Sequence, residues 1–210
     1  MDLEDLSDRL HQRFDAKTAA REQALPAARR AIRASANAIR AVHRGEFETA
    51  ASLIAGARRE LDVGFTAVEQ QPDVRFAGYL RDAEKEYAEA CLTLALVRGD
   101  DMPDPETVAV GDAPYLNGIA EAIGEGRRHI LDLLRTGDVE RAERILAELE
   151  DMYGLLVTMD YPDAITMNLR RSTDVSRSLI EKTRGDLSIA FAQRDIQAAL
   201  DEHARRLRDA

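Results

Sequence analysis

Apolar residues recur at steps of three and four along almost the whole chain, and alternating runs of β-branched residues are nearly absent. A period of 3.6 residues is typical of amphipathic α-helices. The sequence therefore predicts an all-α protein, a bundle of about seven helices. Because the chain contains no Pro/Ser-rich linker, we expect a single domain over residues 1–210, with residues 1–20 and 190–210 as peripheral helical ends.

Glycine and proline divide this pattern into helices. The expected helices cover about 3–44, 46–68, 76–98, 113–135 and 139–158, followed by a short helix after Pro162 and a last long element from about 172 onward. Pro26 either begins a new helix or kinks the first one. Gly185 either ends the last helix or lies within it. We expect Val175, Leu179 and Ile189 to share one apolar side of that helix.

The helix expected over residues 76–98 carries a pair of carboxylates beside its apolar stripe. The stripe begins at Phe76 and continues through Tyr87 to Val97. At about 100° per residue, Glu86 and Glu89 lie together on one flank of this stripe. Like charges three residues apart repel by about a few tenths of a kcal/mol, so the pair gains from a cation or from water. A solvated acidic helix face is the commoner origin of such a pair.

The helix expected over residues 113–135 offers two more carboxylates, Glu121 and Glu125, on the face opposite its apolar stripe. It also contains several glycines, each costing about 1 kcal/mol relative to alanine, which indicates close approach of another backbone or a ligand. Carboxylate oxygens suit Mg²⁺ or Mn²⁺, ions that polarise a phosphoryl oxygen and activate water. The four glutamates could therefore share a metal site, unless the two helix faces never meet.

Charge alone argues against nucleic acid as a partner. The formal net charge is −10, from 39 acidic and 29 basic residues, and an acidic surface repels a phosphate backbone. However, only three of the basic residues are lysines, and the planar fork of arginine is the better phosphate ligand. A nucleic-acid-binding protein and a structural helical bundle both remain open. The chain has no phosphate-binding glycine loop, no zinc-type spacing and no Ser-His-Asp order.

The chain lacks the sequence features of a membrane or exported protein. No apolar run approaches the roughly 20 residues of a membrane span, and the acidic N-terminus does not resemble a signal peptide. We therefore expect a cytoplasmic protein with no membrane partner. The single cysteine, Cys91, lies on the apolar stripe described above, where a buried thiol is expected.

Three motifs occur in a characteristic order over about residues 20–190. They are Glu86-Tyr87-Ala88-Glu89-Ala90, then Pro114 to Glu121 with Gly124-Glu125, then Asp160 to Ile165 with Leu169 to Gly185. In this order the chain resembles the translin / translin-associated factor X family, and the acidic pair resembles the nuclease-like branch found in homo-oligomeric, archaeal-type members. Two positions depart from the family pattern: Glu121 replaces an aspartate, and Pro114 replaces an acidic residue.

The resemblance implies an all-α subunit that assembles into a closed hexameric or octameric shell and binds single-stranded RNA or DNA inside it. The factor X branch is a Mg²⁺-dependent endoribonuclease. Its carboxylates correspond to Glu86, Glu89 and Glu121, and its basic contacts near the start of the third helix to Arg75 and Arg81.

We therefore predict a metal-dependent endoribonuclease that acts on single-stranded RNA inside a homo-oligomer. The predicted catalytic residues are Glu86, Glu89 and Glu121, and the predicted ligands of Mg²⁺ (or Mn²⁺) are Glu86, Glu89, Glu121 and Glu125. The predicted nucleic-acid contacts are Arg75, Arg81, Arg127 and Arg128. The alternatives are a non-catalytic oligomer of the translin type that binds single-stranded RNA or DNA, and a helical bundle that binds no nucleic acid.

Overall fold

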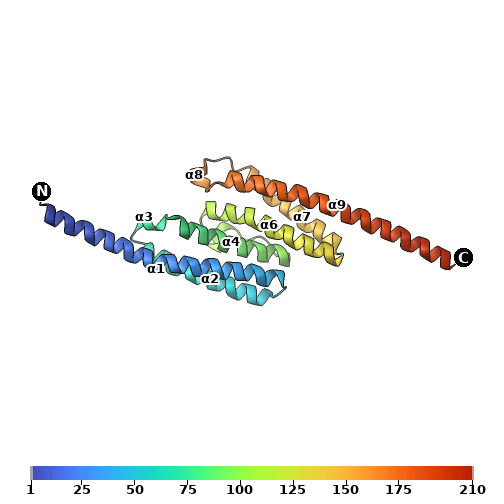
Figure 1. Cartoon of the computed structure of the whole chain (residues 1–210), viewed down its shortest axis with the longest axis horizontal. Helices are drawn as coiled ribbons and strands as arrows, with labels where there is room; N and C mark the ends of the chain where they lie inside the picture. Colours follow the sequence, from blue (N-terminus) through green and yellow to red (C-terminus); the bar gives the residue numbers. More distant parts are fainter. Residues whose placement is uncertain (1, 210) are drawn as a thin grey trace. The chain divides into compact units, whose positions relative to one another are not determined.

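The computed structural model describes residues 2–209, which form nine helices and no strand (Figure 1). The six long helices are α1 (Leu3–His43), α2 (Phe47–Val68), α4 (Gly78–Arg98), α6 (Asp112–Thr136), α7 (Val139–Val157) and α9 (Leu169–Arg208). The three short ones are α3 (Pro72–Arg75), α5 (Pro105–Val108) and α8 (Asp163–Thr166). The predicted all-α class is confirmed. The count exceeds the predicted seven because short four-residue helices also form at Pro72 and Pro105.

Two helices continue through residues that the sequence marks as possible breaks. Pro26 lies inside α1, which is continuous over 41 residues, so it does not begin a new helix. Gly185 likewise lies within α9. This last helix begins at Leu169, three residues earlier than predicted, after Asn168 in a left-handed conformation (φ 61°).

The described residues form two compact units, one through Gly118 and the other from Ile119 onward, and the boundary falls inside α6. The expectation of a single domain stays a prediction. In the first unit, α1 lies against α2 and α4 and contributes mostly alanines to the core, whereas α2 and α4 contribute larger side chains such as Leu61 and Leu80. Small residues on one helix allow its neighbours to approach closely.

In the second unit, α7 packs against α9. The buried face of α9 includes Thr173, Ser176 and Thr183, whose hydroxyls donate to carbonyls four residues earlier at 2.7–3.0 Å. Val175 and Ile189 were predicted to lie on the apolar side of this helix, but they are 53% and 59% exposed. The prediction was wrong for these two residues, whereas Leu179 is partly buried. Hydroxyls that are satisfied by the helix backbone can be buried at little cost, so the buried face is less apolar than hydropathy indicates.

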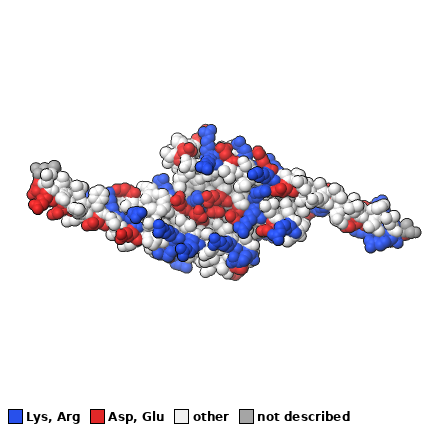
Figure 2. All heavy atoms as spheres, in the orientation of Figure 1, with Lys and Arg blue, Asp and Glu red and all other residues white. Residues whose placement is uncertain are grey.

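The two chain ends are long, exposed helical segments that carry exposed apolar side chains. Leu3, Leu10 and Phe14 are exposed at the start of α1, and Ile196, Leu200 and Leu207 at the end of α9. Figure 2 shows acidic side chains gathered at the N-terminal end and basic ones at the C-terminal end. No helix among the described residues is apolar over a length that would cross a membrane.

Candidate metal centre

Helix α4 holds Glu86 and Glu89 one turn apart, next to its buried face. Tyr87, Ala88 and Ala90 between and beside them are all buried, and Glu89 itself is only 8% exposed. Glu86 is partly buried. The helix ends at Gly99, whose left-handed conformation (φ 75°) glycine adopts without strain. A buried carboxylate costs free energy unless a cation or hydrogen bonds compensate its charge.

Helix α6 approaches α4 through Gly118, where the first turns of α6 still belong to the first unit. A Cβ atom added to Gly118 would lie 2.8 Å from the Cβ of Ala88 and 3.1 Å from the backbone nitrogen of Glu89. These distances leave no room for a side chain, so the two helices meet backbone to backbone at this point. Glu121 lies three residues further along α6, which is about one turn.

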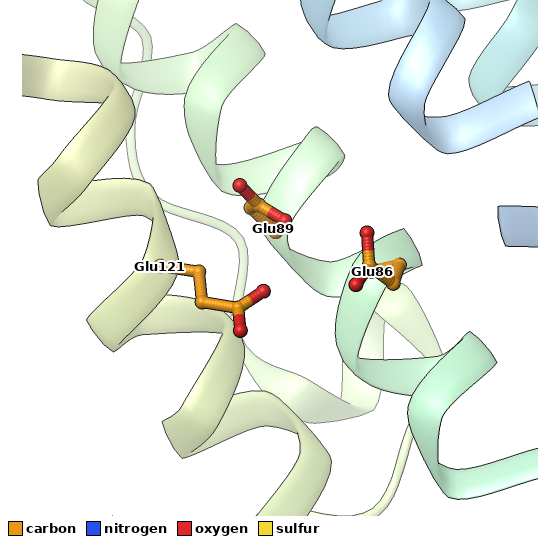
Figure 3. Close-up of side chains that lie close together, drawn as sticks. All are labelled: Glu86, Glu89 and Glu121. Atoms are coloured by element: carbon orange, nitrogen blue, oxygen red, sulfur yellow. The ribbon is translucent and has the colours of Figure 1, made fainter. Parts of the chain in front are cut away.

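The three predicted carboxylates come together (Figure 3). Each of Glu86, Glu89 and Glu121 offers one oxygen, and these oxygens all lie within 4.8 Å of one another. Glu121, like Glu86, is partly buried. The arrangement therefore joins one enclosed carboxylate with two that reach solvent.

This donor set fits a hard divalent cation. Mg²⁺ binds oxygens at about 2.0–2.1 Å, so opposite ligands of one ion lie about 4.2 Å apart. A spread of up to 4.8 Å exceeds that separation by roughly 0.6 Å, which a small rotation of a glutamate side chain supplies. Lys85 Nζ lies 3.4 Å from Glu86 Oε1 and offsets one of the three negative charges. Oxygen-only ligands of this kind favour a hard divalent ion such as Mg²⁺.

Glu125, the fourth predicted ligand, is not one of the three clustered carboxylates. It follows Glu121 by four residues on α6, and its Oε2 lies 3.7 Å from Nη1 of Arg128. It therefore extends the acidic set along the helix and also pairs with a predicted phosphate contact.

The two neighbouring arginines of α6 have different surroundings. Arg127 is enclosed: its Nη2 lies 2.8 Å from Asp186 Oδ2, and its Nη1 donates to Thr183 Oγ1 at 2.8 Å. These contacts connect α6 to α9 within the second unit. The side chain of Arg128, by contrast, is 58% exposed. Of these two arginines, Arg128 is therefore the more accessible to a ligand from solvent.

Arg75 and Arg81 lie near the start of α4 and stack on aromatic rings. The Cζ of Arg75 is 4.6 Å from the ring centre of Phe65, and that of Arg81 is 5.6 Å from Phe76. Both arginines oppose the effect of burial, which raises the pKa of the half-buried Glu84 carboxyl. The sequence pattern placed Phe76 on the apolar stripe, but it precedes the helix and is 61% exposed.

Comparison with known proteins identifies relatives of this fold. No family model matches the chain. AfC3PO, from an archaeal Archaeoglobus, is 33% identical with a TM-score of 0.80, covering 92% of this chain and 99% of that one. Its structure in complex with duplex RNA gives 32% identity and a TM-score of 0.79, covering 92% of this chain and 98% of that one. An uncharacterised protein of Methanocaldococcus jannaschii is 32% identical over 197 residues, which are 91% of this chain and 83% of that protein.

A more distant structure, apo-NeC3PO from Nematostella, shares the fold at a TM-score of 0.75 and 20% identity, covering 90% of this chain and 97% of that one. The fold is therefore that of an all-helical protein of the C3PO type. The chain belongs to the translin / translin-associated factor X family.

Proposed function

We propose that this protein is a metal-dependent endoribonuclease that acts on single-stranded RNA. The observation that carries the proposal is the convergence of Glu86, Glu89 and Glu121, with carboxylate oxygens within 4.8 Å of one another. The similarity to AfC3PO, of which a complex with duplex RNA has been solved, supports RNA as the ligand.

The three glutamates would hold Mg²⁺ or Mn²⁺. When bound, such an ion polarises a phosphoryl oxygen and lowers the pKa of a coordinated water. Glu89, which is buried, would fix the position of the set, while Glu86 and Glu121 reach the solvent from which RNA arrives. Glu125, four residues beyond Glu121, would extend the negative field as a fourth carboxylate. Glutamate in all three positions also suits Mn²⁺, which accepts the same oxygen donors.

Arginines would hold the RNA backbone. Arg128 is exposed on the same helix as Glu121, and Arg75 is exposed near the start of the helix that carries Glu86. Arg81 would be a further phosphate contact, whereas Arg127, which is paired with Asp186 and Thr183, would contribute mainly its positive charge. The guanidinium groups would supply the positive charge that the protein as a whole lacks, at net charge −10.

The protein would work as a cytoplasmic homo-oligomer, a hexamer or an octamer. Burying a Leu or Ile side chain is worth about 1.5–3 kcal/mol, so exposed apolar residues at both ends favour association. The acidic first turn of α1 and the basic last turn of α9 could attract each other between copies. Light scattering should give a mass several times 23.3 kDa, and Ile196→Glu with Leu200→Glu should lower it. A monomeric wild-type protein would contradict the proposed homo-oligomer.

Cleavage of labelled single-stranded RNA tests the activity. Wild-type protein should produce internal cuts with Mg²⁺ and none with EDTA, and Glu89→Gln should lose at least about a hundredfold in rate if one metal ligand is lost. Equal cleavage by the two proteins would refute the assignment of the site.

A second function, binding without cleavage, is favoured by Lys85, whose ammonium group already lies 3.4 Å from Glu86. In that case the combined alanine variant at Glu86, Glu89 and Glu121 should bind RNA as wild type does, and neither protein should cut it.

A further inference from the structure

The start of α4 is surrounded by an arginine–aromatic cluster, formed by Arg58, Arg75 and Arg81 with Phe65, Phe76 and Tyr87. Arg58 lies over two rings, with its Cζ 5.5 Å from the centre of Phe65 and 5.6 Å from that of Tyr87. Arg75 lies over Phe65, and Arg81 over Phe76. All of these distances are within the roughly 6 Å at which a cation and a ring attract each other. The cluster lies wholly within the first unit.

Phe76 differs from the other two rings because most of its surface is in solvent. Tyr87 is buried at 6% exposure and Phe65 is partly buried, but Phe76 is 61% exposed. Its backbone is held at the end of α3, where its N–H donates to Pro72 O at 3.1 Å, and its ring is in contact with the Arg81 guanidinium. An exposed ring forgoes much of the roughly 1.5–3 kcal/mol that burial would give, and its surface is available to a ligand.

Two arginines lie near Phe76: Arg75 precedes it in the chain, and Arg81 lies over its ring. Two arginines of the cluster, Arg75 and Arg81, influence the carboxylate of Glu84, yet within residues 2–209 neither has a carboxylate oxygen within 4.0 Å. Glu84 instead accepts the backbone N–H of Gly111 at 3.2 Å, and burial raises its pKa. The guanidinium groups of Arg75 and Arg81 therefore remain available to an anion beside an exposed aromatic face.

We propose that Phe76 is a stacking platform for an unpaired base, with Arg81 and Arg75 holding the neighbouring phosphates. The inference rests on the proposed function and adds a residue that would select the single-stranded form of the substrate: a base can stack on Phe76 only where its face is free, as in a single strand. A π-face combined with a positive groove is the way proteins bind single strands without reading their sequence. The site would accept all four bases, because each has such a face.

The test is the affinity for a short single-stranded RNA, measured by filter binding in EDTA so that no cleavage occurs. Phe76→Ala should weaken binding about 5- to 150-fold, the range for loss of one stacked base. Phe76→Leu, which keeps apolar bulk without a ring, should weaken it as much, and Phe76→Trp should restore it. The slope of affinity against salt should not change in these variants, whereas Arg81→Ala should reduce it by about 0.7.

Tyr161→Ala is the matched control. Tyr161 is 62% exposed, and none of the described arginines or lysines lies over its ring, so its loss should leave RNA affinity unchanged. Light scattering on Phe76→Ala should give the wild-type mass. A lowered mass would make Phe76 a subunit contact and overturn the inference.

Wild-type affinity in Phe76→Ala or Phe76→Leu would also overturn it while leaving the proposed function intact. Failure of the wild-type protein to bind any single-stranded RNA would overturn both.

Discussion

Gly118 and Ala88 lie so close together that a Cβ on the glycine would be 2.8 Å from the Cβ of the alanine. This contact sets the approach of α6 to α4, and Glu121 follows one turn beyond it on α6. Because real Cβ atoms do not approach to 2.8 Å, even the smallest side chain at this position must push the two helices apart.

Gly118→Ala should therefore destabilise the protein. Overpacking typically costs about 1–3 kcal/mol, of which roughly 1 kcal/mol is recovered from helix propensity. Gly124→Ala in the same helix is the control, because its added Cβ would lie at an ordinary 3.8 Å from Leu179 Cδ1 and should be neutral or slightly stabilising. Urea denaturation compares the two. A Gly118→Ala protein as stable as Gly124→Ala would show that the helices do not meet as described.

The clustered carboxylates should make stability depend on divalent ions. The comparison variant is Glu89→Gln, which removes one of the three clustered carboxylates. Mg²⁺ should raise the melting temperature of wild type but not of the variant. A free ion concentration of a hundred times the dissociation constant adds about 2.7 kcal/mol to the free energy of unfolding of a protein that binds the ion. Thermal unfolding followed by circular dichroism measures the response of each protein. Equal responses to Mg²⁺ would argue against an ion at Glu89.

Arg127 and Arg128 should respond differently to replacement by alanine. Removing Arg127 leaves the Oδ2 atom of Asp186 buried without its guanidinium partner, at a cost of about 1–3 kcal/mol. Arg128→Ala should change the free energy of unfolding by less than about 0.5 kcal/mol, because the side chain is exposed.

For RNA binding by the folded proteins we expect the reverse: Arg128→Ala should weaken the affinity more than Arg127→Ala does. Arg128→Ala should reduce the salt slope of RNA binding by about 0.7 if it contacts one phosphate. A slope equal to that of wild type would remove Arg128 from the proposed RNA contacts.

Cys91 should be unreactive and should make the fold sensitive to alkali. Burial, the largest influence, raises the pKa of the thiol from 9.0 to about 11. The folded protein then holds this proton more tightly than the unfolded chain, so stability should be unaffected below about pH 9 and should fall as pH rises from 9 to 11. The two-unit shift corresponds to at most about 2.7 kcal/mol.

Cys91→Ala should lose less stability than wild type between about pH 9 and pH 11. Urea denaturation of both proteins at these two pH values measures the difference. An identical pH dependence in the two proteins would contradict the raised pKa.

Helices were predictable where an apolar period and a clear stop coincided. Gly99 and Gly137 end α4 and α6 in left-handed conformations, and the sequence placed both ends to within about one residue. Pro26 and Gly185 were ambiguous because a long helix that packs on its neighbours tolerates a local cost of about 1–3 kcal/mol. The hydrophobic period does not show whether packing compensates for that cost. Phe76 was misplaced because the helical period was extended past the helix start at Gly78.

The candidate site could be predicted only in part. Spacing on one helix paired Glu86 with Glu89, whereas the family resemblance brought in Glu121. The small residues of the helix expected over 113–135 indicated a close contact, but not that Gly118 would meet Ala88. Glu125 was grouped with the other three because it shares a helix face with Glu121. The sequence did not reveal that Arg127 is occupied by Asp186 and Thr183, because that pairing depends on the packing of two helices.

The most direct test of the account is a titration of the protein with Mn²⁺, followed by electron paramagnetic resonance of the free ion. The three-glutamate site predicts one bound Mn²⁺ per subunit in wild type, displaced by excess Mg²⁺. It predicts that Glu89→Gln abolishes this binding and that the exposed control Glu143→Gln does not. The same stoichiometry and affinity in wild type and Glu89→Gln would contradict a metal centre at Glu86, Glu89 and Glu121.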